Sequence, residues 1–303
     1  MRRAFLSLVL VAGCASSGDL KPDRPRPTDQ AQLDKIREID ELFVQGGEEL
    51  DAVVFGVRSD PLVSAWVTRF LILHMADAVQ KQRLVQADRI NFSGMEVNEQ
   101  YQDALRLLKT LADAAVPTVV EELLDHRFSE NRLLGVSILS EMPPMALPAL
   151  DEAYRQGGPR RRRFLVEAVG EMQPGDEAEG HLLGWAADED YLIRAIAFAG
   201  LSRYGENHLP LLQSAVATDP EQFVQRQVVK KLGQFHDKGT AATVVDFYAR
   251  CVQRSDWDGV REAERALMQI AEFPVSENDR RIEKGLAYWR NWITKFAPRE
   301  END

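Results

Sequence analysis

Apolar residues recur along most of this chain at the three- and four-residue spacing that marks one face of a helix. The clearest example is the segment 193–205, where one predicted helix face is formed by Ile193, Ile196, Ala197, Gly200, Leu201 and Tyr204. No segment shows the alternating apolar and polar pattern of a half-buried strand. The pattern therefore predicts an all-α protein.

Residues 29–115 are predicted to form an irregular helical region. It contains a long apolar helix that starts near residue 61. Three pairs of residues have the chemistry of helix N-terminal caps: Asp29 with Gln32, Asp60 with Pro61, and Ser93 with Glu96.

From residue 116 the pattern becomes periodic. Three prolines at equivalent helix starts are separated by 31 and 62 residues, namely Pro117, Pro148 and Pro210. Apolar positions of the following helices are separated by 30, 32 and 31 residues, namely Leu139, Val169, Leu201 and Leu232. A fifth helix pair, 241–252 and 260–270, follows after a longer loop. Two helices per unit of about 31 residues are typical of an α-solenoid.

The second helices of these units resemble HEAT repeats, in which an arginine is followed by a small residue three positions later and a leucine four beyond that. The full matches are Arg194, Ala197 and Leu201, and Arg132, Gly135 and Leu139. Looser matches are Arg162, Leu165 and Val169, then Gln225, Val228 and Leu232, and a shifted fifth helix around Arg261. The resemblance covers residues 116–273, about half of the chain. It implies a right-handed α-solenoid of about five hairpins, a fold used mainly for binding.

The segment 274–298 is predicted to end the fold with one amphipathic helix. Its apolar face comprises Ile282, Leu286, Trp289, Ile293 and Phe296, and Trp292 widens it. We expect this helix to cap the open end of the array, which every solenoid requires. The alternative is that the two tryptophans form a surface for a partner.

The N-terminus has the features of an export signal. Arg2 and Arg3 precede a short apolar run, 4–13, that is too short to span a bilayer. The run ends in Val11-Ala12-Gly13-Cys14, which resembles the lipobox of bacterial lipoproteins. The resemblance implies removal of residues 1–13 and lipidation of Cys14. The alternative is an ordinary secretory signal in which Cys14 has no role.

The resemblance also implies a location in the cell envelope. Because Ala15 is not an aspartate, sorting is expected to follow that of outer-membrane lipoproteins facing the periplasm. Residues 14–28 contain three prolines and few apolar residues, so they are predicted to form a flexible tether between the lipid and the folded part.

Charge and cysteine content add two constraints. The formal net charge of −11 disfavours a nucleic-acid partner, which requires a basic surface. If Cys14 carries lipid, Cys251 has no disulfide partner. Cys251 lies in an apolar helical run, so we expect a buried structural thiol and not a nucleophile.

We expect no catalytic or metal-binding motif in this sequence. No histidine has a second His or Cys three or four positions later, so no helical metal-ligand pair is predicted. The segment 256–259 resembles part of a calcium loop, but Arg265 stands where a glutamate would complete it. Asp258 is instead expected to cap the next helix. We therefore predict no catalytic residue, no metal and no cofactor.

One basic cluster stands out against the acidic background: Arg160, Arg161, Arg162 and Arg163, at the start of a predicted helix. Four arginines oppose the helix dipole at this position. The cluster is either a solvated turn with one structural arginine, Arg162, or a site that binds an anionic group of a partner.

Two classes of function remain open. The first is a lipid-anchored, non-catalytic scaffold that binds a protein or an envelope polymer. The second is a HEAT-like enzyme of the lyase type, or a binder of small ligands, at the cell envelope. A pocket with converging carboxylates would favour the enzyme.

Overall fold

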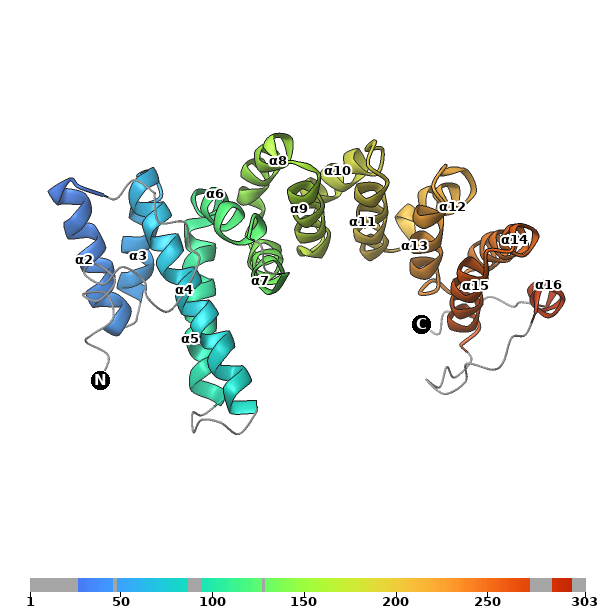
Figure 1. Cartoon of the computed structure of the whole chain (residues 1–303), viewed down its shortest axis with the longest axis horizontal. Coiled ribbons are helices and arrows are strands. Elements are labelled where there is room, and N and C mark those ends of the chain that lie inside the picture. Colours follow the sequence, from blue (N-terminus) through green and yellow to red (C-terminus); the bar gives the residue numbers. More distant parts are fainter. Residues whose placement is uncertain (1–26, 46–47, 87–93, 127–128, 273–284, 296–303) are drawn as a thin grey trace, which may run out of the picture. The chain divides into compact units, whose positions relative to one another are not determined.

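The computed structural model describes residues 27–45, 48–86, 94–126, 129–272 and 285–295 (Figure 1). These residues form helices joined by turns, and they contain no strand. The predicted all-α class is therefore confirmed for the part of the chain that the structure describes.

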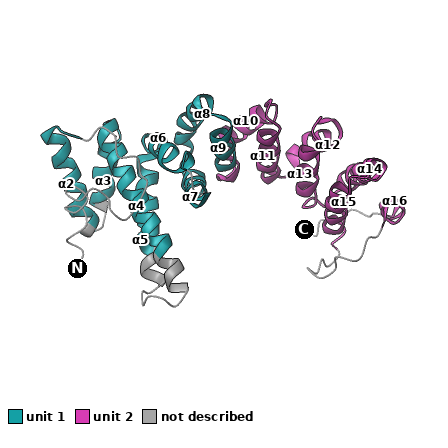
Figure 2. Ribbon diagram, in the orientation of Figure 1, with its two compact units in different colours: residues 1–168 teal, residues 169–303 magenta. Residues whose placement is uncertain are grey.

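The chain divides into two compact units, residues 1–168 and residues 169–303 (Figure 2). The division falls inside helix α9 (Pro159–Glu171) and within the predicted repeat segment. The predicted limits of the signal peptide, tether, helical region, repeats and terminal helix stay predictions.

Unit 1 begins with helices α2 (Gln30–Gln45), α3 (Glu48–Gly56), α4 (Pro61–Gln86) and α5 (Gly94–Leu111). Asp60 caps α4, because its Oδ1 accepts hydrogen bonds from the backbone N–H groups of Leu62 and Val63 at 3.1 and 3.2 Å. Asp29 caps α2 by accepting from Ala31 N at 2.8 Å. Gln32 does not share in that cap: its amide donates to Asp60 Oδ2 at 2.9 Å and ties α2 to the start of α4. The side chains of Ser93 and Glu96 lie outside the described residues.

Helix α4 is the long apolar helix of the sequence analysis. Its segment Pro61–Gln80 is long and apolar enough to cross a membrane, and half of that window is buried within the protein. Ser129–Ser140 and Pro144–Gln156 meet the same condition only as a pair bent by 120°. Val67, Leu71 and Met75 of α4 are buried, as in the core helix of a globular unit.

Unit 1 continues through η1 (Ala112–Ala114), α6 (Val116–Val119), η2 (Val120–Leu124), α7 (Ser129–Ser140), η3 (Pro144–Ala146) and α8 (Leu147–Gln156). The π-helical turn η2 was not predicted. Its Glu122 is buried and binds the Arg69 guanidinium of α4, with Arg69 Nη2 and Glu122 Oε1 2.7 Å apart. Arg69 and Glu122 are far apart in the sequence, so their contact leaves no pattern among neighbouring residues. Helical periodicity alone therefore does not predict this ion pair.

Unit 2 contains α10 (Asp176–Trp185), α11 (Tyr191–Leu201), η4 (Ser202–His208), α12 (Leu209–Thr218), α13 (Gln222–Leu232), α14 (Lys238–Arg254), α15 (Trp257–Ile270) and α16 (Leu286–Thr294). Helix α11 is shorter than the predicted segment 193–205, because a 3₁₀ turn takes over at Ser202 and Gly205 adopts a φ of 77°. Ile193, Ala197 and Leu201 are buried as predicted.

The three repeat prolines hold the same place in their helices. Pro117, Pro148 and Pro210 are each the second residue of α6, α8 and α12. Each helix follows a 3₁₀ turn, and the apolar residue before each proline is buried. A proline fits here because the first helical N–H groups have no partner within the helix.

The described part of the terminal helix is α16, which packs against α14. Trp289 is 0% exposed, and the centroid of its ring lies 5.5 Å from that of Trp292. The indole of Trp289 is therefore part of the core and does not offer a surface to a partner. Ile282 and Phe296 lie outside the described residues.

Candidate functional site

The structure separates the four arginines of α9. Arg160 is exposed. Arg161 donates from Nε and Nη2 to the two carboxylate oxygens of Asp125, at 3.1 and 2.5 Å. Arg162 donates to Tyr154 O at 3.2 Å and lies over the ring of Tyr154. Arg163 is partly buried. Sequence reasoning singled out Arg162 as structural, and the structure adds Arg161.

A recurring hydrogen bond accounts for the repeat-type arginines. Arg132 donates to His126 O at 2.7 Å, and Arg194 donates to Asp188 O at 2.9 Å. Gln225, which replaces arginine in the next unit, donates to Asp219 O at 2.6 Å. Each side chain thus reaches the carbonyl six residues earlier, in the turn before its own helix. The position needs a long donor, and glutamine supplies one.

The apolar repeat positions lie in the core. They are at most 1% exposed: Leu139, Val169, Leu201 and Leu232. Burial of such side chains stabilises a fold by about 1.5–3 kcal/mol each. These residues have a structural role.

Of the two cysteines, Cys14 lies outside the described residues, and its lipidation stays a prediction. Cys251 is buried, as expected. Burial, with the nearby charge of Asp256, raises the pKa of the Cys251 thiol to about 12. The thiol is therefore protonated at neutral pH, and it lacks the thiolate that a nucleophile requires.

Asp256, and not Asp258, caps α15. Asp256 Oδ1 accepts a hydrogen bond from Gly259 N at 3.0 Å. Helix α15 begins at Trp257, two residues before the start that a cap at Asp258 would give. The Asp258 carboxylate is exposed and pairs with Arg261 and Arg226. The turn after α14, in which Ser255 has a φ of 57°, ends directly before this cap.

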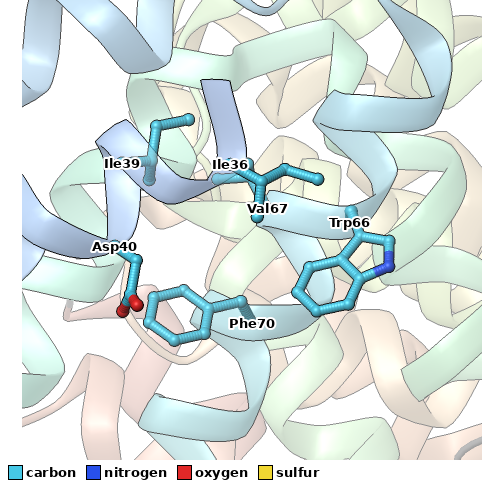
Figure 3. A pocket seen from close by; sticks show the side chains of 6 residues that line it. All are labelled: Ile36, Ile39, Asp40, Trp66, Val67 and Phe70. Carbon is cyan, nitrogen blue, oxygen red and sulfur yellow. The ribbon is translucent and has the colours of Figure 1, made fainter. Parts of the chain in front are cut away.

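The side chains of α2 and α4 enclose a small cavity in unit 1. Ile36, Ile39 and Asp40 face Trp66, Val67 and Phe70 across it (Figure 3). Its volume of about 10 Å³ has room for no more than one water molecule. Burial, with the adjacent charge of Glu41, raises the pKa of Asp40. The cavity is a packing gap at this size, because an organic ligand requires several hundred Å³.

Unit 2 has a wider hollow of about 490 Å³ at the C-terminal ends of α13 and α15. Its lining residues are Lys230, Lys231, Gly233, Gln234, His236, Gln269 and Glu272. Two of these side chains complete neighbouring helix ends: Gln234 donates to Ser202 O at 2.7 Å, and His236 Nδ1 lies 3.0 Å from Ile270 O. The two lysines lie in the last turn of α13 and complement the negative end of its dipole.

No group of three or more His, Cys, Asp or Glu side chains in the described ranges is arranged to hold a metal ion. Within those ranges one acid–histidine pair is Glu179 with His208, whose Oε1 and Nε2 lie 2.9 Å apart.

Comparison with known proteins identifies no family for this chain. No protein-family model matches the chain, and no curated protein or solved structure matches it with significance.

Sequence reasoning missed one surface feature. Three aromatic side chains lie at the starts of successive second helices in unit 2: Tyr191, Phe223 and Trp257. The repeats align at Arg194, Gln225 and Arg261, and the three aromatic residues lie three, two and four positions before these residues, so they occupy neighbouring but not identical repeat positions. Alignment on the core positions alone does not reveal it.

Proposed function

We propose that this chain is a non-catalytic scaffold of the cell envelope. A lipid on Cys14 anchors the protein to the membrane. The folded part is an α-solenoid of HEAT-like hairpins that binds another protein or an envelope polymer. The anchoring rests on the lipobox resemblance of residues 11–14. Two or more acyl chains hold a protein on a membrane stably. The location at the outer membrane, facing the periplasm, rests on Ala15.

The observation that carries the solenoid is a set of hydrogen bonds that span one predicted repeat. Arg203 donates to Gly170 O, 33 residues earlier, and Gln234 donates to Ser202 O, 32 residues earlier. Arg250 donates to Val216 O, 34 residues earlier. Contacts between successive hairpins at a nearly constant sequence offset, here 32 to 34 residues, are what the repeat architecture requires.

A second candidate is the binding of a small anionic ligand in the hollow of unit 2. Lys230, Lys231 and His236 line that hollow and favour this alternative. The main proposal has an advantage over it, because repeat arrays bind through extended surfaces and the hollow is wide open to solvent.

The anchor is tested with full-length protein expressed in a bacterium and extracted in a detergent that separates into two phases. We expect the native protein in the detergent phase and the Cys14→Ala variant in the aqueous phase, because the variant lacks the acylated thioether. Crosslinking and pull-down from the same membranes should enrich one envelope component with the native protein and lose it with Cys14→Ala. Native protein in the aqueous phase would contradict the anchor, and no enriched component would contradict the scaffold.

The arginine cluster is tested at Arg160, since Arg161 and Arg162 are held by Asp125 and Tyr154 and Arg163 is partly buried. Arg160→Glu should lower capture of the partner about threefold or more if the cluster contacts an anionic group. Arg155→Glu, at an exposed position of the neighbouring helix α8, is the matched control. Equal capture by both variants would remove the cluster from the binding surface, and circular dichroism would verify unchanged helix content.

A further inference from the structure

Three second helices of unit 2 begin with exposed aromatic rings. Tyr191 is the first residue of α11, Phe223 the second of α13, and Trp257 the first of α15. Tyr191 is 39% exposed and Trp257 is 63% exposed, while Phe223 is partly exposed. First turns of helices usually carry polar or acidic residues. We call these three residues the aromatic edge.

The helices that carry the aromatic edge lie side by side and run in the same direction (Figure 1). At their starts, the ring centroids of Tyr191 and Phe223 lie 5.7 Å apart in an edge-to-face contact. At their ends, Gln234 after α13 donates to Ser202 O after α11. Gly233, also at the end of α13, lies against Ala266 near the end of α15. The three first turns therefore share one edge of the unit.

Ion pairs set the register of this edge. Arg194, one turn after Tyr191, binds both carboxylate oxygens of Asp219, which lies just before α13. Arg226, one turn after Phe223, lies with its Nη1 3.4 Å from Asp256 Oδ1, directly before Trp257. Each of these two ion pairs joins an aromatic first turn to the start of the next helix, and the second brings the start of α15, where Trp257 lies, next to the first turn of α13.

Acidic side chains border the row. Glu189 and Glu221 precede α11 and α13 and are exposed, and the charge of Glu221 also acts on Arg194, whose pKa it raises. Asp258 follows Trp257 and is also exposed, and it pairs with Arg261 and Arg226. The helix dipoles account for carboxylates at these starts. They do not account for the rings, whose exposure to water is unfavourable.

We infer that the aromatic edge of Tyr191, Phe223 and Trp257 is a docking surface for a basic protein segment. Lysine or arginine side chains of that segment would lie over the exposed ring faces, where a cation is attracted by the aromatic quadrupole. Glu189 and Glu221 would pair with further cations, which matches the charge of the surface to that of the partner. The inference rests on the proposed scaffold function and names the chemistry of its partner.

The test uses the full chain carrying Cys14→Ala and two fluorescein-labelled 16-residue peptides, one of alternating Arg and Ser and one of alternating Glu and Ser. Fluorescence anisotropy at physiological salt gives the dissociation constants. We expect binding of the basic peptide only, and an approximately fivefold or larger loss of affinity for Trp257→Ala, because a cation–π contact is removed. Phe55→Ala is the matched control, since Phe55 is 60% exposed in unit 1 and should leave binding unchanged.

A charge control separates docking from general attraction to an acidic protein. Glu189→Lys with Glu221→Lys should abolish peptide binding, whereas Asp176→Lys with Glu177→Lys, the same change of charge at exposed positions of α10, should weaken it only slightly. Equal losses in the two double variants, an unchanged affinity for Trp257→Ala, or no binding of the basic peptide would each overturn the inference.

Pull-down from membranes, with the native Cys14 in place, distinguishes this inference from the scaffold proposal. If native protein captures an envelope protein and Trp257→Ala captures equally much, the aromatic edge is not the docking surface and the scaffold stands. If native protein captures none, the scaffold proposal itself fails. Loss of capture in Trp257→Ala alone, together with the peptide result, supports both.

Discussion

Asp219→Ala is expected to lower the free energy of unfolding by about 3–5 kcal/mol, the usual cost of removing one partner of a buried ion pair. The Arg194 and Asp219 side chains are only 12% and 6% exposed. Asp219 accepts from Arg194 Nε and Nη2, both at 2.9 Å, and its Oδ1 also accepts from Glu221 N at 2.9 Å before α13. The substitution would remove all three bonds and leave a guanidinium in a site with little water.

The charge of Arg194 cannot be relieved by loss of a proton. The hydrogen bond to Asp219 raises the pKa of Arg194 above its already high ordinary value, so the group is charged at every pH at which the protein is folded. In Asp219→Ala the guanidinium would keep the carbonyls of Asp188 and Glu189 as acceptors.

Urea unfolding followed by circular dichroism measures the effect of Asp219→Ala. Asp258→Ala is the matched control, because Asp258 and its partner Arg261 are 67% and 64% exposed, and exposed pairs contribute at most about 1 kcal/mol. A change of less than about 1 kcal/mol for Asp219→Ala would show that the pair does not hold α11 against the start of α13.

Gly200→Ala is expected to lower the free energy of unfolding by about 2 kcal/mol. A Cβ atom on Gly200 would lie 2.9 Å from Gly170 Cα and 3.1 Å from both Cδ atoms of Leu182. The nearest atom belongs to the backbone of α9, so the helices must separate, and such overpacking costs about 1–3 kcal/mol or more. We expect the overpacking cost to lie near the upper end of that range. The better helix propensity of alanine offsets about 1 kcal/mol of it.

Gly184→Ala in α10 is the control for this substitution. A Cβ atom there meets no atom within 4 Å, so only helix propensity changes, and we expect a gain of about 0.5–1 kcal/mol. Opposite signs for the two glycines in thermal or urea unfolding would confirm close packing of α9 against α11. A gain for both would contradict it.

Part of the functional surface was accessible to sequence reasoning and part was not. The sequence predicted a structural role for Arg162 from its repeat-type position, and a buried Cys251 from the apolar helical run in which it lies. It did not predict the aromatic edge. Tyr191 belongs to the first turn of its helix and lies outside the core spacing on which the repeats were aligned. Its contact with Phe223 arises only when α11 and α13 stack.

Sequence alone predicts the all-α class and the starts of α2 and α4, because a cap involves groups only two or three residues apart, as in Asp60 with Leu62 and Val63. Which charged side chains are available to a partner depends on the tertiary structure. Arg161 is engaged by Asp125, 36 residues away, and Arg194 by Asp219, 25 residues away. Such pairs depend on how helices stack. Helical periodicity records which face of a helix is buried, but it does not record which residue of a distant turn lies opposite.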